Sequence, residues 1–238
     1  MLLTRRQLLA EFLGTALLVI AVVGSGIAAA RLSPGDVGLE LLENAAATGA
    51  ALVAIILALG PVSGAHLNPA ITGADRLRGA ISTRTAIGYV VAQVAGGIAG
   101  TVVANLMFTL PAVQLSQRVR SGGGVWLAEA VATFGLILVV FGLARSGRSA
   151  LAPFAVGAYI SGAYFFTSST SFANPAVTIA RMFSNTFAGI APASVAAFLG
   201  FQLVGAAVAV AALGVLYPKV ASGATEVVLP HPTEEAAW

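Results

Sequence analysis

The chain has 238 residues, of which 58% are hydrophobic and only 9% are charged, and its mean hydropathy is +0.93. A soluble domain is usually about one quarter charged, so this composition excludes an ordinary soluble protein. The chain has no cysteine, which excludes disulfides, thiolate metal sites and thiol catalysis. Its net charge of +3 comes from short arginine clusters between apolar segments, so no nucleic-acid partner is predicted.

Six apolar stretches are long enough to cross the hydrocarbon core of a bilayer, which takes about 20 residues each. The first follows a basic start and resembles a signal peptide, but Glu11 interrupts it, so we expect a retained helix. The six predicted spans run approximately over residues 8–30, 40–60, 82–107, 123–144, 149–168 and 192–217.

Two further apolar segments, residues 66–77 and 172–184, are too short to span a bilayer. Each contains an Asn-Pro-Ala triplet, and asparagine followed by proline favours the start of a helix. We therefore predict two half-helices that begin inside the membrane, where irregular backbone is tolerated only if it is buried or lines a cavity. The triplets are Asn68, Pro69 and Ala70, and Asn174, Pro175 and Ala176.

The basic residues predict the orientation, because cytoplasmic loops carry more lysine and arginine. In a six-span arrangement most of them fall on the side of both termini, which predicts cytoplasmic termini. We expect one transmembrane domain over residues 1–220 and a disordered cytoplasmic tail over 221–238. One side carries Arg5, Arg6, Arg76, Arg78, Arg84, Arg145, Arg148 and Lys219, and the other carries Arg31, Arg118 and Arg120.

The chain contains an internal repeat, over approximately residues 5–110 and 123–218. Both halves begin with Glu-x-x-x-Thr, at Glu11 and Glu129, and both contain one triplet. Three spans per half place the second half upside down, and inverted repeats with broken helices predict a site at the bilayer midplane.

An ionisable group in a spanning helix is costly and needs a role. We expect Glu11 and Glu129 to accept hydrogen bonds from the backbone before each half-helix, with His66 packing in the same loop. A proton relay through these groups is the alternative.

These motifs carry a family resemblance. With "HLNPA", "FANPA" and a Glu-x-x-x-Thr before each, the chain resembles the aquaporins of the major intrinsic protein family over about residues 5–218. The resemblance implies an all-α membrane protein of six transmembrane helices and two re-entrant half-helices, assembled as a homotetramer in the bilayer with one pore in each protomer.

The physical chemistry of two meeting half-helices agrees with this picture. Their N-termini place positive dipole ends at the pore centre, and the amides of Asn68 and Asn174 can donate hydrogen bonds to a passing molecule. Cations and protons are opposed there, while water and small neutral solutes are not. We expect passive transport, with no enzymatic activity, no cofactor and no bound metal.

The resemblance also implies four residues at the narrowest part of the pore. They are Thr48, with Gly49 as the neighbouring alternative; Gly162; Ser171, with Phe172 as the alternative; and Val177. The family usually has an aromatic residue at the first position and arginine at the fourth, and this chain has neither. The expected filter is wide and weakly polar, which favours solutes of glycerol size or larger.

Bacterial aquaglyceroporins associated with arsenic resistance also lack the filter arginine. That likeness implies arsenite, antimonite and methylated arsenicals as substrates, in a bacterial inner membrane. A general glycerol and urea facilitator is the alternative. Two further alternatives are an ion-coupled transporter and a non-conducting protein of the same fold.

Arg181 lies one helical turn beyond Val177 on the same face. Helical side chains lean toward the N-terminus, here toward the filter. Arg181 either restores positive potential at the outer mouth or anchors the end of the half-helix.

Overall fold

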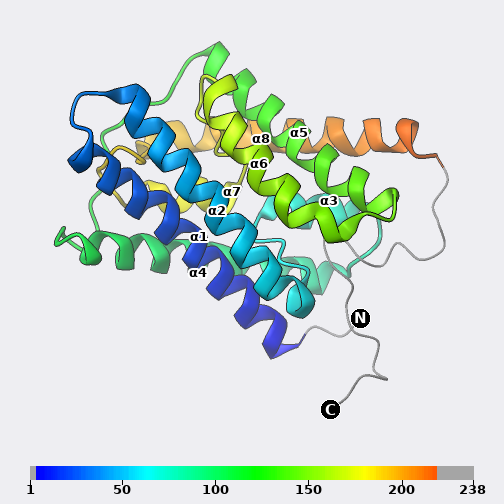
Figure 1. The fold of residues 1–238 in the computed structure, drawn as a ribbon. Helices are drawn as coiled ribbons and strands as arrows, with labels where there is room; N and C mark the ends of the chain where they lie inside the picture. The colour runs from blue at the N-terminus through cyan, green and yellow to red at the C-terminus, as the bar shows by residue number, and fades with distance from the viewer. Residues whose placement is uncertain (1–3, 219–238) are drawn as a thin grey trace.

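The computed structural model describes residues 4–218, and every regular element in this part of the chain is a helix. Six of its helices are long and apolar enough to cross a membrane. They run side by side with the two short helices among them (Figure 1). The predicted all-α fold of six spans and two half-helices is confirmed. The long helices are α1 (Arg5–Leu32), α2 (Val37–Ser63), α4 (Thr83–Met107), α5 (Gly123–Arg145), α6 (Ala152–Phe166, preceded by the 3-10 turn Ser149–Leu151) and α8 (Pro192–Leu216).

The two short helices, α3 (Pro69–Leu77) and α7 (Pro175–Arg181), begin in the same way. Proline occupies the first turn, where its missing N–H costs no hydrogen bond. The asparagine before it caps the helix with its side-chain oxygen, which accepts from Ala70 N at 2.8 Å in α3 and from Ala176 N at 3.0 Å in α7. The Asn-Pro pair therefore determines where each half-helix starts.

The long helices of the two halves pack in matching ways. α1 packs on α2 and α4, and α5 packs on α6 and α8. Gly96 of α4 meets the backbone of Phe12, and Gly205 of α8 meets the backbone of Ala130. A Cβ atom at either glycine would overlap that backbone, so glycine permits the close approach of the two helices.

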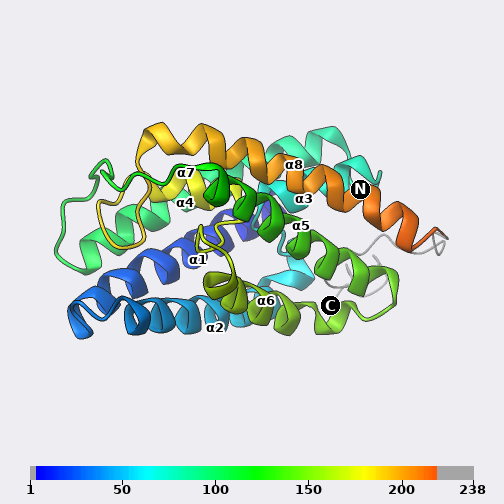
Figure 2. The same ribbon diagram turned by 90° about the horizontal axis from the view of Figure 1, so that it is seen from above.

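The half-helices join the two halves together. α3 contacts α5 and α8 as well as α4 of its own half, while α7 contacts α1 and α4 as well as α8. The halves also meet directly where α2 packs on α6. In the view of Figure 2, α8 runs along one side of the molecule and α2 along the other. The predicted tail over residues 221–238 lies outside the described residues.

Candidate functional site

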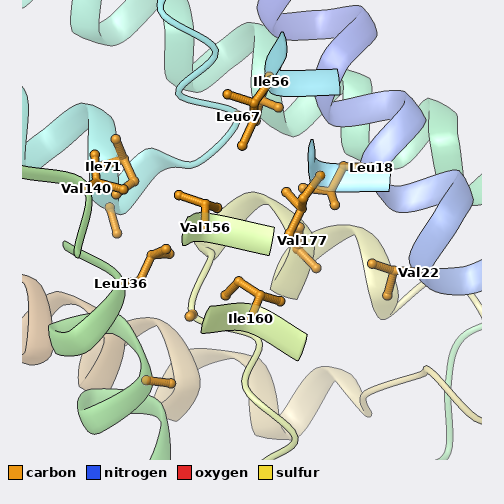
Figure 3. Packing of buried hydrophobic residues seen from close by; sticks show 14 of the residues in the cluster. Leu18, Val22, Ile56, Leu67, Ile71, Leu136, Val140, Val156, Ile160 and Val177 are labelled. Atoms are coloured by element: carbon orange, nitrogen blue, oxygen red, sulfur yellow. The ribbon is translucent and has the colours of Figure 1, made fainter. Parts of the chain in front are cut away.

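One cavity runs between the two halves and has a mostly apolar wall. Side chains from α1, α2, α3, α5, α6 and α7 surround it, together with Leu67 from the loop before α3 (Figure 3). Both triplet asparagines, Asn68 and Asn174, lie on its wall. The apolar residues labelled in Figure 3 that line the cavity are Leu18, Val22, Ile56, Leu67, Ile71, Leu136, Val140, Val156, Ile160 and Val177.

The two asparagines are held by reciprocal hydrogen bonds across the repeat. Asn68 Nδ2 donates to the carbonyl of Ala173, and Asn174 Nδ2 donates to the carbonyl of Leu67, each at 2.8 Å. An amide nitrogen has two hydrogens. Each side chain is thus oriented by one N–H and retains a second donor, at a point where both border the cavity.

Glu11 fixes the loop that precedes α3. Its carboxylate accepts from the backbone N–H groups of His66 at 3.0 Å and Leu67 at 2.8 Å. It also accepts from Ser63 Oγ at 2.6 Å and from Gln93 Nε2 at 2.7 Å. Four donors around one fully buried carboxylate compensate its removal from water.

Glu129 has the equivalent contacts in the second half. It accepts from the backbone N–H groups of Phe172 at 2.9 Å and Ala173 at 3.0 Å, and from Gln202 Nε2 at 2.5 Å. These are the loop contacts expected for both glutamates. The repeat therefore preserves individual hydrogen bonds as well as the order of helices.

Both loops adopt the same unusual backbone conformation. Ala65 and Ser171, each three residues before the asparagine, have φ values of 46° and 51°. Leu67 and Ala173, each one residue before it, have φ values of 51° and 48°. Left-handed backbone is unfavourable for residues with a Cβ atom, and it persists where surrounding contacts hold it. Here Glu11 and Glu129 hold Leu67 and Ala173, while the hydroxyl groups of Ser63 and Ser169 accept from the N–H groups of Ala65 and Ser171.

The end of the cavity beyond Val177 is lined by a small set of polar and aromatic groups. Val177 itself is 4% exposed and presents an apolar side chain. Thr48 Oγ1 pairs with the hydroxyl of Tyr164 at 3.2 Å. Ser171 and Phe172 both line the cavity, so this part of the wall includes both alternatives for the third filter position.

Arg181 also lines this end of the cavity, which we call the Arg181 end. Its guanidinium carbon lies 3.4 Å from the centroid of the Phe172 ring, and its Nε donates to the carbonyl of Ala188. Arg120, from the loop before α5, lies over the same ring at 5.0 Å. Burial, and to a lesser extent Arg181 and Arg118, lower the pKa of Arg120 to about 9, which leaves it protonated at neutral pH.

At the opposite end, which we call the His66 end, His66 borders the cavity. Its Nδ1 lies 3.1 Å from Thr72 Oγ1, its Nε2 lies 3.7 Å from a carboxylate oxygen of Asp75, and its ring packs edge-on against Tyr89. Thr72 in turn accepts from Gln93, which also donates to Glu11. His66 is thus held in place by several neighbours.

The family model for the major intrinsic proteins matches residues 2–173. The chain is 52% identical to aquaglyceroporin AqpS of Rhizobium meliloti (strain 1021) over 206 residues, which cover 87% of this chain and 88% of that protein. The chain belongs to the major intrinsic protein family. The solved aquaglyceroporin of Plasmodium falciparum shares the fold, with a TM-score of 0.69 and 21% identity over 90% of this chain and 97% of that one.

The assignment of Gly162 to the filter of this major intrinsic protein, which was made from sequence spacing, is wrong. Gly162 is exposed on α6 and does not line the cavity. A Cβ atom there would meet only the ring of Phe166, at 3.8 Å. Tyr164 takes the place on the wall, because α6 presents Val156, Ile160 and Tyr164, at spacings of four residues, to the cavity.

In the structure Thr48 lines the cavity, whereas its neighbour Gly49 packs against Ser161 and Gly157 of α6. Tyr164 was not among the residues predicted from the sequence. The sequence pattern that could have identified it is the spacing of four residues between Val156, Ile160 and Tyr164, which places all three on one face of α6.

Proposed function

We propose that this protein is a passive channel for small uncharged solutes of glycerol size and larger, and that it also passes some water. The observation that carries the proposal is a cavity that borders both triplet asparagines and has Val177 where the family usually has arginine. The name aquaglyceroporin, which AqpS of Rhizobium meliloti carries, supports it.

The electrostatics of the centre favour neutral solutes. The N-termini of α3 and α7 meet near Asn68 and Asn174, so their positive dipole ends face the passage from both sides. A cation or a proton is repelled there, whereas a neutral hydroxyl compound receives hydrogen bonds from the asparagine amides. The half-helices therefore act as a barrier to ions and as a binding position for neutral molecules.

The apolar wall of the cavity indicates which neutral solutes the channel would pass. A solute that has hydroxyl groups and an apolar side fits a passage with a few donors and many aliphatic side chains. Glycerol-like polyols have this character, and so do the neutral trivalent hydroxides of arsenic and antimony and the methylated arsenicals. Because the described cavity has no cysteine thiol, such metalloids would pass without being trapped. A general glycerol and urea facilitator without a metalloid role is the alternative.

We further propose a homotetramer in a bacterial plasma membrane with both termini in the cytoplasm. The arginine distribution supports this orientation, and the bacterial relative supports the membrane. In this orientation the Arg181 end is the outer end of the cavity, and the His66 end is the inner one.

Light scattering on proteoliposomes tests the proposal. The purified protein should accelerate the response to glycerol, urea and arsenite gradients over that of protein-free liposomes, and an imposed proton or sodium gradient should not drive uptake. Movement of water alone would contradict the proposed filter. Saturable uptake driven by an ion gradient would instead favour a coupled transporter, and no response to any solute would favour a non-conducting protein.

A further inference from the structure

The two half-helices carry a matched pair of charged residues that reach back to a ring. Asp75 and Arg181 each lie seven residues after a triplet asparagine, and His66 and Phe172 each lie two residues before one. Asp75 lies 3.7 Å from the ring nitrogen of His66, and Arg181 lies 3.4 Å from the centroid of Phe172. The repeat thus preserves one contact in both halves, and in the second half the charged member itself reaches the cavity.

The guanidinium of Arg181 is fixed in position yet retains donors. It is 2% exposed, stacks on Phe172, and among the described residues donates one hydrogen bond, from Nε to Ala188. A guanidinium has five N–H donors in a planar fork. The remaining donors belong to the two terminal nitrogens, on a side chain that lines the cavity.

Ser171 supplies an independent indication of a ligand at the same end. Its side chain is 3% exposed and lines the cavity, and its Oγ has no hydrogen-bond partner in the described part of the chain. A buried hydroxyl without a partner is costly. Its left-handed backbone conformation, with φ of 51°, is held by the same loop that Glu129 supports.

Arg120, unlike Arg181, uses all three of its guanidinium nitrogens in hydrogen bonds to the protein. Its Nε donates to the carbonyl of Gly189 at 2.9 Å, and its terminal nitrogens donate to the carbonyls of Phe187 at 3.3 Å and Ser169 at 3.4 Å. Its donors bind the loops around Phe172. Arg120 therefore braces the ring on which Arg181 stacks, and Arg181 has donors left for a solute.

We propose that Arg181 and Ser171 form a donor subsite that binds a hydroxyl oxygen of the permeating solute, one helical turn beyond Val177. The subsite deepens the proposed channel function and rests on it. It assigns the substrate class more narrowly, as polyhydroxylated solutes in preference to deoxy analogues of similar size. It also gives the filter a fixed cation that opposes the entry of other cations, although Val177 carries no charge.

The test compares glycerol with 1,3-propanediol, which lacks one hydroxyl group, in stopped-flow measurements on proteoliposomes. Arg181→Met should lower the ratio of glycerol to propanediol permeability by about tenfold, as expected from the loss of a hydrogen bond to a charged group. The same variant should raise the sodium leak. Ser171→Ala should lower the ratio by about threefold to fivefold, as for a neutral hydrogen bond.

Arg118→Gln is the matched control, because it removes the same charge from an exposed arginine that does not line the cavity. Its permeability ratio should equal that of the wild type. Should Arg181→Met fail to fold, Ser171→Ala decides alone, since the Ser171 hydroxyl bonds to no other described group.

An unchanged ratio in Ser171→Ala, or in folded Arg181→Met, overturns the subsite and leaves Arg181 as an anchor of α7. A wild-type protein that conducts neither solute overturns the channel itself. A wild type that conducts both solutes with a ratio unaffected by the variants overturns only the subsite.

Discussion

At the scale of single residues, Tyr164 and Val177 define the passage more than their sequence neighbours do. Tyr164 pairs with Thr48 on the cavity wall, while Val177 adds an apolar surface where a longer charged side chain would narrow the space. Gly162, two residues away from Tyr164, lies on the exposed face of the same helix. Side-chain direction along α6 decides which of these residues a solute meets.

This placement predicts opposite outcomes for two substitutions in α6. Gly162→Leu should leave glycerol permeability at the wild-type value, because the new side chain points away from the cavity. Tyr164→Ala should admit a larger polyol such as xylitol, because it removes a ring from the wall. Swelling rates with glycerol and xylitol check both, and a loss of glycerol flux in Gly162→Leu would return that position to the filter.

Most of the residues that line the cavity could be predicted from the sequence, but not all of the contacts between them. Asn68 and Asn174 follow from the repeated triplet, and Val177 follows from its spacing along α7. Thr48 and Gly162 are both counted back across an irregular loop, and the loop before α7 is the longer of the two, so its path is the harder one to infer from spacing. The stacking of Arg181 on Phe172 depends on left-handed backbone in that loop, which no local pattern announces.

At the scale of elements, the close packing of α4 on α1 and of α8 on α5 holds the cavity walls in place. Gly96 and Gly205 allow the partner backbones to approach, in a setting where helix association depends on packing rather than on the hydrophobic effect. The predicted spans agree with the observed helices within a few residues, because each span is a long apolar run. The half-helices were equally predictable, since Asn-Pro determines their start.

We expect Gly205→Ala to destabilise the protein by about 1–3 kcal/mol, because the new methyl group would overlap the backbone of Ala130. Gly200→Ala is the matched control in the same helix, where nothing lies within 4 Å of the added atom. Alanine favours a helix over glycine by about 1 kcal/mol, so this control should be neutral or stabilising. Thermal unfolding in detergent measures both, and equal midpoints for the two variants would refute the close contact.

At the scale of the whole molecule, two inverted halves share one cavity whose walls come from both. Each half-helix packs against the other half, so the passage exists only when both halves are in place. Oligomeric assembly is not needed to complete the described cavity, because its lining residues come from one chain.

We therefore expect every protomer of the proposed homotetramer to conduct independently. Mixing wild-type subunits with a blocked variant should reduce glycerol flux in proportion to the fraction of blocked subunits. Flux measurements on co-expressed tetramers of known composition check this, with the mass of the detergent-solubilised complex as the control for assembly. A steeper than proportional loss would indicate that the protomers act together.

The most direct test of the central claim is the ratio of glycerol to water permeability in proteoliposomes, before and after Val177→Arg. We expect the wild type to conduct glycerol, and arginine at this position to lower glycerol permeability much more than water permeability, because the longer charged side chain narrows the passage. A wild type that conducts water but no glycerol, or a variant with an unchanged ratio, would contradict it.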